Sequence, residues 1–204
     1  MIKAVIFDQG GVIACEDWNV NREHVFSKLI KLIDADVEKA HELFDFYYHD
    51  KGLVYGRGDE DEFFSELVKL SPNVVSSVEA KKLYYTLFYL HEDVFRFARR
   101  LSKKHALYML SNDVKPWFDY KARKFGFRKV FRKLFCSADI GMKKPEARIY
   151  EYVIKELGIA PQEILFIDNQ ENNVNGAQSA GMNTILFVSL GQLKNDLERF
   201  GIKE

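Results

Sequence analysis

The chain has 204 residues, which is enough for one well-buried core, or for a core domain that carries a smaller insertion. Hydrophobic residues make up 47% and charged residues 29%, as in ordinary globular proteins, and lysine plus arginine equals aspartate plus glutamate at 30 each. This balance gives no electrostatic basis for nucleic acid or an anionic membrane surface as the main partner.

The cysteine pattern and the lack of a secretory or membrane-spanning segment in this sequence indicate the cellular context. Its two cysteines, Cys15 and Cys136, lie far apart and match neither a disulfide framework nor a metal-ligand spacing. The first residues read as a strand rather than a secretory signal, and no run approaches the roughly 18 to 20 apolar residues that span a bilayer. We therefore expect a cytoplasmic protein, a monomer or small homo-oligomer, that binds a small molecule and neither nucleic acid nor a membrane.

The first predicted element is a buried strand over Ala4–Phe7, and a long helical stretch follows it. The helical patterns in this stretch cover Val20–Ile33, Val37–His49, Glu60–Leu70 and Ser77–Leu90. A segment of this length is too large for an ordinary connection between two strands. The sequence therefore predicts an inserted helical cap domain, residues 17–90, and a core domain made of residues 1–16 and 91–204.

The rest of the chain alternates between helices and apolar strands. A helix over Glu92–Lys104 comes first, and a later helix is expected to open at Pro145 and to end at Gly158. The remaining strands are expected at Leu107–Leu110, Lys133–Cys136, Ile164–Ile167 and Thr184–Val188. Continuous apolar runs are typical of parallel strands covered on both faces, so the pattern predicts an α/β fold with a doubly wound parallel sheet.

Polar residues follow four of the predicted strands, where ligands bind in an open parallel sheet. Each of these residues is common in turns, but together they predict one site at one edge of the sheet. The segments are Asp8-Gln9-Gly10-Gly11, Ser111-Asn112-Asp113, Lys144 before Pro145, and Asp168-Asn169 with the residues up to Asn173.

The acidic members of this set suit phosphoryl transfer assisted by Mg²⁺. An aspartate such as Asp8 can attack phosphorus and form an aspartyl phosphate, which water later cleaves. A cation must then offset the repulsion between the Asp8 carboxylate and the substrate phosphate. Asp168 and the Gly10 carbonyl would complete an oxygen-rich magnesium site, to which Asn169 adds a ligand directly or through water.

The remaining members suit binding of the transferring group. Lys144 would neutralise charge on the phosphoryl oxygens, and Ser111 and Asn112 would supply hydrogen bonds. Asn172 and Asn173 have two readings: they only start the next helix, or they orient Lys144 and Asp168.

Four segments resemble the ordered motifs of the haloacid dehalogenase superfamily: FDQGGVI, LSND, GMKKPEARIY and LFIDNQENNVNGAQSAGM. The resemblance extends from residue 2 to residue 188, and the helical insertion resembles the cap of the type-I-capped members. It implies that Asp8 is the nucleophile, that Ser111 and Lys144 bind phosphate, and that Asp168 is a magnesium ligand. The lysine directly before the proline matches the motif, which favours Lys144 over Lys143. The first loop and KPEARIY are most similar to the bacterial α-D-glucose-1-phosphate phosphatase-like subgroup.

The sequence departs from this family at Gly10. Most phosphatases of the superfamily carry a second aspartate there, as general acid and base, a role typically worth about 10²–10⁴-fold in rate. Three explanations remain open. Asp17, Glu16 or a cap histidine replaces it; or the leaving group is an anomeric or acyl oxygen that departs readily; or the protein is a slow relative with a binding role.

The leading hypothesis is a magnesium-dependent phosphatase for a small phosphorylated metabolite, most simply a sugar phosphate. The nearest alternative is a 2-haloacid dehalogenase, which uses the same aspartate on carbon without a metal; Asp168 and the glycine pair argue against it. The alternative from another class is a binding or regulatory module with this fold and little turnover.

Overall fold

A computed structural model describes residues 1–14 and 25–204. Its centre is one sheet of five parallel strands in the order β3-β2-β1-β4-β5. β1 is the middle strand, and its Val5 lies opposite Leu107 on one side and Leu165 on the other. The strands are β1 (Ala4–Phe7), β2 (Leu107–Ser111), β3 (Lys133–Cys136), β4 (Ile164–Asp168) and β5 (Asn183–Leu186). The predicted doubly wound α/β fold is confirmed.

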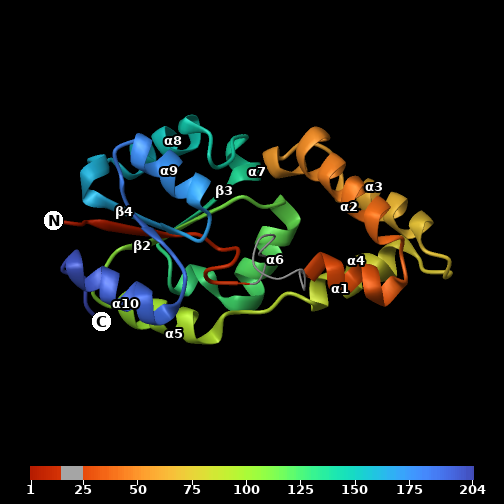
Figure 1. Ribbon diagram of the computed structural model, residues 1–204, viewed down its shortest axis with the longest axis horizontal. Coiled ribbons are helices and arrows are strands. Elements are labelled where there is room, and N and C mark those ends of the chain that lie inside the picture. Colours follow the sequence, from red (N-terminus) through yellow and green to blue (C-terminus); the bar gives the residue numbers. More distant parts are fainter. Residues whose placement is uncertain (15–24) are drawn as a thin grey trace.

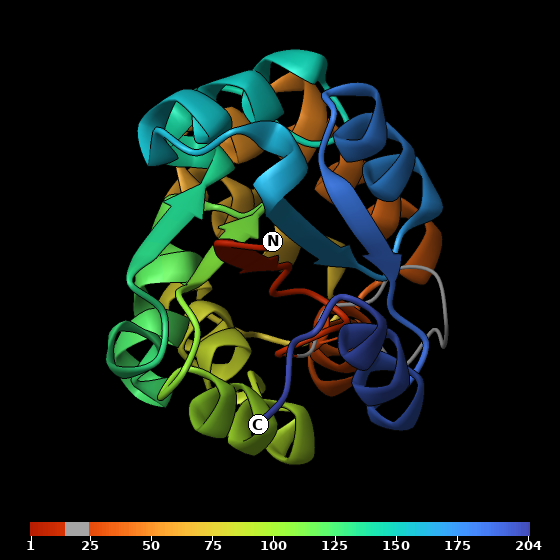
Figure 2. The same ribbon diagram turned by 90° about the vertical axis from the view of Figure 1, so that its left-hand side faces the viewer.

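Helices cover both faces of this sheet (Figure 2). Val5 and Phe7 of β1 pack in the apolar cluster on one face, and Ala4 and Ile6 pack in the cluster on the other. Because both faces are buried, the strand sequence is continuously apolar rather than alternating. The first face carries α5 (Glu92–Leu101), α6 (Lys115–Phe125) and α10 (Leu190–Arg199), and the second carries α8 (Ala147–Leu157) and α9 (Glu171–Ser179). A short helix, α7 (Ser137–Ile140), follows β3.

Local sequence signals explain where several helices end. Gly158 has a left-handed backbone, and its N–H donates to the carbonyls of Ile154 and Lys155, which confirms the predicted end of α8. Gly126 ends α6 in the same conformation.

The prediction that Pro145 opens a helix is wrong, because α8 begins only at Ala147. The side chain of Asn112 binds both the N–H and the carbonyl of Lys144, which holds Lys144 and the following proline in a turn. The Lys144–Pro145 peptide bond is cis.

Two other predicted elements are shorter in the structure. β5 ends at Leu186 rather than Val188, since the Val188 N–H donates to the Gln192 side chain at the start of α10. The helix predicted over Glu92–Lys104 ends at Leu101, where the chain enters a turn.

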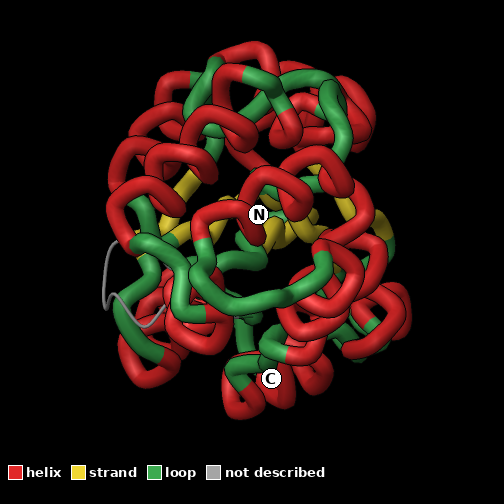
Figure 3. The backbone as a smooth tube through the Cα atoms, turned by 90° about the vertical axis from the view of Figure 1, so that its right-hand side faces the viewer, coloured by secondary structure: helices red, strands yellow, loops and turns green. Residues whose placement is uncertain are grey.

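The described cap residues, 25–90, lie beyond the carboxyl ends of the strands (Figure 1), and Figure 3 views the molecule from that side. Their last helix ends at Thr86 rather than at the predicted Leu90, since Leu87 already forms its C-cap. The segment 20–24 of the first predicted helix lies outside the described residues. The helices are α1 (Val25–Ile33), α2 (Val37–Asp45), α3 (Glu60–Leu67) and α4 (Ser77–Thr86). The shorter helical segments are η1 (Phe46–Asp50), η2 (Leu53–Tyr55) and η3 (Val68–Leu70).

An aromatic cluster joins the cap helices to the core. Phe63, Phe64 and Tyr84 of the cap are buried around Trp117, a residue of the core helix α6. The Trp117 indole N–H donates to Glu60 of α3 at 2.6 Å. The cap helices therefore pack on α6 as well as on one another. The division of domains at residues 16/17 and 90/91 stays a prediction, and the first of these points lies outside the described residues.

Within the described part of the chain, every helix is too short or too polar to cross a bilayer.

Candidate active site

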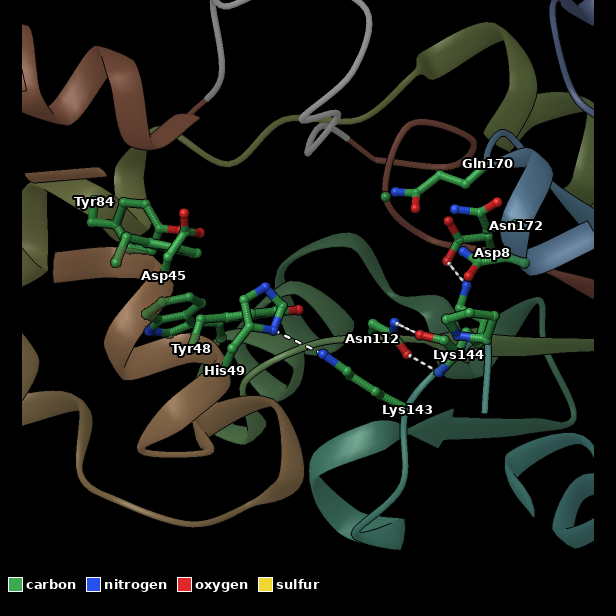
Figure 4. A pocket seen from close by; sticks show the side chains of 15 residues that line it. Asp8, Asp45, Tyr48, His49, Tyr84, Asn112, Lys143, Lys144, Gln170 and Asn172 are labelled. Carbon is green, nitrogen blue, oxygen red and sulfur yellow. Dashed lines mark hydrogen bonds and ion pairs between the residues drawn. The ribbon is translucent and has the colours of Figure 1, made fainter. Parts of the chain in front are cut away.

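Three charged residues from separate loops meet at the carboxyl edge of the sheet. Asp8 follows β1, Asp168 ends β4, and Lys144 lies in the loop after α7; each is at most 5% exposed. Lys144 Nζ lies 2.7 Å from Asp8 Oδ1 and 2.7 Å from Asp168 Oδ2 (Figure 4 shows the contact with Asp8). It also donates to the carbonyl of Leu110 at 3.1 Å. The fold thus brings together three residues that the sequence singled out.

The cluster places two carboxyl groups beside one ammonium group, so it carries a net negative charge when both carboxyl groups are ionised. Burial raises the pKa of Asp8 to about 7; the Asp168 charge adds to the rise, and Lys144 opposes it. Burial alone would lower the pKa of Lys144, but the charges of Asp168 and Asp8 raise it above its ordinary value. Lys144 therefore stays protonated, and the cluster would be stabilised by a further cation.

The residues at this edge fit the magnesium ion expected from the sequence. Asp8 and Asp168 supply carboxylate oxygens, and Gly10 lines the same cavity as Asp8. No group of three His, Cys, Asp or Glu side chains gathers in the described ranges. Mg²⁺ suits this smaller set, since it usually keeps several waters and takes only one or two carboxylates.

Two asparagines position the charged residues. Asn112 Oδ1 accepts the Lys144 N–H and Asn112 Nδ2 donates to the Lys144 carbonyl, both at 2.8 Å. Asn173 Nδ2 lies 3.1 Å from each Asp168 oxygen, and the Gln170 N–H donates to Asp168 Oδ1 at 2.8 Å. Asn173 is thus both part of α9 and a partner of Asp168. The side chain of Asn112 holds the Lys144 backbone, and its contact with a substrate stays a prediction.

Ser111 and Asn169, which the sequence also predicts for the site, lie next to site residues in the chain but are not among the described residues that line the cavity. Ser111 is the last residue of β2 and is buried. Asn169 lies against Gly11, whose φ of +74° suits glycine and where any side chain would collide with the Asn169 amide. The ligand and substrate roles of Ser111 and Asn169 stay predictions.

A cavity of about 430 Å³ extends from this cluster to the cap. Its cap wall includes Asp45, Tyr48 and His49, from α2 and η1, and Figure 4 shows these side chains across the cavity from Asp8. From the sequence, the aromatic segment that contains Asp45 and Tyr48 is expected to form either the cap core or its inner wall, and the structure places these two residues at the wall. His49 was not predicted there, because helical periodicity does not say which side of a cap helix faces the core. On the core side the cavity is lined by Asp8, Gly10, Asn112, Trp117, Lys143, Lys144, Pro145, Gln170, Asn172 and Asn173.

His49 and Lys143 meet across the cavity, with 2.9 Å between His49 Nδ1 and Lys143 Nζ. Burial and the Lys143 charge lower the pKa of His49, so the imidazole is neutral near pH 7, and its Nδ1 accepts a hydrogen bond from the Lys143 ammonium group. The role of a cap histidine as the replacement acid stays a prediction. Asp17 and Glu16, the other residues considered as replacements for the acid absent at Gly10, lie outside the described residues.

Comparison with known proteins agrees with this fold. A D-ribitol-5-phosphate phosphatase of Bacteroides thetaiotaomicron is 27% identical over 196 residues, covering 90% of this chain and 91% of that protein. The drimenol cyclase drtB of Aspergillus calidoustus is 26% identical over 209 residues, 97% of this chain, and the chain spans only 36% of its length. A haloacid dehalogenase family enzyme of Bacteroides thetaiotaomicron, in complex with magnesium and inorganic phosphate, superposes with a TM-score of 0.74 at 23% identity, covering 95% of this chain and 99% of that one.

The model of the haloacid dehalogenase-like hydrolases matches residues 2–181, which include all four strand-end loops of the site. The chain therefore belongs to the haloacid dehalogenase-like hydrolases and is a hydrolase.

Proposed function

We propose that this hydrolase is a magnesium-dependent phosphatase that acts on a small, polyhydroxylated phosphate ester, a sugar phosphate. The observation that carries the proposal is Lys144 Nζ bridging the buried carboxylates of Asp8 and Asp168. A nucleophile, a cationic group for the phosphoryl oxygens and a second carboxylate for a metal then stand within a few ångströms.

The reaction takes two displacements at phosphorus. An Asp8 carboxylate oxygen attacks phosphorus while the bond to the leaving oxygen breaks, which gives an aspartyl phosphate and the free alcohol once the leaving oxygen gains a proton. Water then attacks the same phosphorus, which releases inorganic phosphate and restores Asp8. Lys144 offsets charge on the phosphoryl oxygens in both steps. Magnesium, held by Asp8, the Gly10 carbonyl and Asp168, would supply further charge neutralisation.

Gly10 provides no acid for the leaving oxygen, which favours a substrate whose oxygen departs readily. An anomeric or acyl oxygen needs less help from a proton donor than an ordinary alkoxide does. Among the described residues that line the cavity, the carboxyl groups are those of Asp8 and of Asp45, which lies across the cavity on the cap, so we expect the highest rates with esters of good leaving groups.

The cavity supports a hydroxylated substrate. Its cap wall presents the polar groups of Asp45, Tyr48 and His49, and its core side adds Lys143 and other hydrogen-bonding side chains. Groups of this kind bind hydroxyls better than they bind a hydrocarbon chain. The similarity to a ribitol-5-phosphate phosphatase, and to a structure that holds magnesium and phosphate, also supports the proposal.

A panel of phosphorylated metabolites, assayed with and without Mg²⁺, tests this proposal, with Asp8→Asn as control. We expect metal-dependent release of phosphate that Asp8→Asn abolishes. Chloride release from 2-chloropropionate without Mg²⁺ would instead identify a dehalogenase. No turnover, and no thermal stabilisation by Mg²⁺ with beryllofluoride, would identify a binding module.

A further inference from the structure

Behind the nucleophile lies a buried polar network that the reaction scheme does not use. Gln9, the residue after Asp8, is fully buried, and its Nε2 donates to Asp113 Oδ2 at 3.0 Å. The same oxygen lies 2.9 Å from Lys121 Nζ of α6, and the side chains of Asp113 and Lys121 are both 0% exposed. These three residues, the Gln9 network, are absent from the described lining of the cavity.

Stability alone gives a weak reason for such a network. Removing two charges from water carries a large desolvation cost, and apolar residues of similar volume often serve a core equally well. Lys121 lies on the face of α6 next to Ala122 and Phe118, where apolar side chains form the core. A buried ion pair in this place therefore points to a requirement for defined geometry.

The geometry that the network defines is that of the nucleophile loop. The Gln9 backbone N–H hydrogen-bonds the Asp8 carboxylate. The Gln9 carbonyl accepts the N–H groups of Ile13 and Ala14 at 2.9 and 2.8 Å. Gln9 thus orients the attacking carboxylate and closes the loop of residues 9–14, while its own side chain is fixed by Asp113.

Asp113 is in turn tied to the cap. Its N–H donates to Ser137 Oγ at 3.0 Å, and this hydroxyl donates to the carbonyl of Val54, in η2, at 2.7 Å. Lys121 Nζ lies 4.7 Å from the ring centre of Phe88, in the segment that leaves the cap. The network therefore contacts both the middle and the end of the cap.

We propose that Gln9, Asp113 and Lys121 are positioning residues, which hold the Asp8 loop in its attacking geometry and fix it relative to the cap at Val54 and Phe88. The kinetic tests of this inference rest on the proposed phosphatase function. It assigns a purpose to a buried ion pair that is absent from the described lining of the cavity.

The first test is Gln9→Met, which removes the donor to Asp113, keeps the side-chain volume and leaves the ion pair intact. Misplacement of a reacting group by about 1 Å can lower a rate about 100-fold, so we expect kcat for p-nitrophenyl phosphate at saturating Mg²⁺ to fall about 10- to 100-fold, with KM almost unchanged. Gln178→Met, at an exposed hydrogen bond to Thr184, is the matched control and should keep the wild-type kcat. Wild-type kcat in Gln9→Met would overturn the proposal.

The second test separates the charges from the hydrogen bond. Lys121→Met leaves a buried carboxylate without this ammonium group, whereas the double variant Asp113→Asn/Lys121→Met removes both charges and keeps an amide oxygen for Gln9. We expect the double variant to regain most of the kcat lost in Lys121→Met. Lys133→Met, at the exposed ion pair with Glu156, controls for loss of a lysine. A double variant no faster than Lys121→Met would contradict the proposal.

A third test measures amide hydrogen exchange, so it requires neither enzymatic activity nor a stable Lys121 variant. Amide hydrogen exchange in residues 9–14 should accelerate in Gln9→Met, while exchange in β5 stays at the wild-type rate. Unchanged exchange in residues 9–14 would overturn the positioning role. An inactive wild-type enzyme would refute the proposed function alone, because the exchange measurement would still decide this inference.

Discussion

The core edge of the sheet and the cap wall face each other across one cavity, but they are built differently. At the core edge, Asp8, Lys144 and Asp168 are buried and fixed by short hydrogen bonds. At the cap wall, the side chains of Asp45 and His49 are exposed. The helical segments that carry them are stabilised by the buried aromatic cluster of the cap. The difference indicates that the core sets the chemistry, with little freedom, and that the cap sets which molecule is bound.

The largest expected effect comes from the core edge. Asp8→Asn removes the nucleophile but keeps the side-chain shape, so we expect turnover to fall by about 10⁴-fold or more. Phosphate release under saturating substrate and Mg²⁺ measures the loss. Asp139→Asn, at an exposed ion pair with Lys115, is the matched control and should keep full activity. If Asp8→Asn were as active as Asp139→Asn, the core edge could not supply the nucleophile of the reaction.

The next effect comes from Lys144→Met. We expect a loss of about 10²–10³-fold in kcat, since a preorganised charge on the phosphoryl group is removed. The two buried carboxylates would also repel each other without the lysine, so the melting temperature should fall in EDTA and recover strongly with Mg²⁺. Thermal unfolding with and without the metal measures this. A variant that Mg²⁺ stabilises no more than the wild type would contradict the shared site.

The cap wall should show a smaller and more selective effect. Asp45→Asn removes a carboxylate acceptor for substrate hydroxyls, so we expect KM for the preferred sugar phosphate to rise about tenfold, the worth of one hydrogen bond to a charged group. KM for p-nitrophenyl phosphate, which has no hydroxyls to bind, should stay the same. Asp50→Asn, next to the wall but outside the cavity lining, is the control. An equal rise in KM for both substrates would mean that the cap does not select.

The smallest effect concerns the cap interior. Tyr85 donates to Glu60 through its hydroxyl, at 3.0 Å to one oxygen and 3.1 Å to the other, and it does not line the cavity. Tyr85→Phe should lower the free energy of unfolding by about 1 kcal/mol and leave kcat unchanged. Urea denaturation measures the first and steady-state kinetics the second, with Tyr152→Phe on α8 as control. A drop in kcat would show that packing inside the cap also controls the chemistry.

The same contrast explains what the sequence could predict. The meeting of Asp8, Lys144 and Asp168 follows from topology, since parallel strands place their carboxyl ends at one edge whatever the details of packing. The pairing of Asn112 with the Lys144 backbone does not follow, because it depends on how the loop around Pro145 turns. The turn that contains Pro145 lies next to this pairing, and α8 begins after it, at Ala147.

The exact residues of the cap wall and the Gln9 network could not be predicted for a different reason. Periodicity identifies which side of a cap helix is apolar, but His49 faces Lys143 only because η1 continues α2 with altered winding. Gln9 follows a buried strand and reads as a turn residue, and its partner Asp113 is more than a hundred positions away. The position of Gln9 next to Asp8 is evident in the sequence, but the sequence does not identify Asp113 as its hydrogen-bond partner.

The central claim is covalent attack by Asp8, and chemical trapping of the intermediate tests it most directly. The enzyme is mixed with Mg²⁺ and its best phosphorylated substrate, quenched during turnover, and reduced with borohydride, which converts an aspartyl phosphate into homoserine. Peptide mass spectrometry should find homoserine at position 8, and only when substrate was present. Turnover with aspartate intact at position 8, or with the reduced residue at another position, would contradict the account.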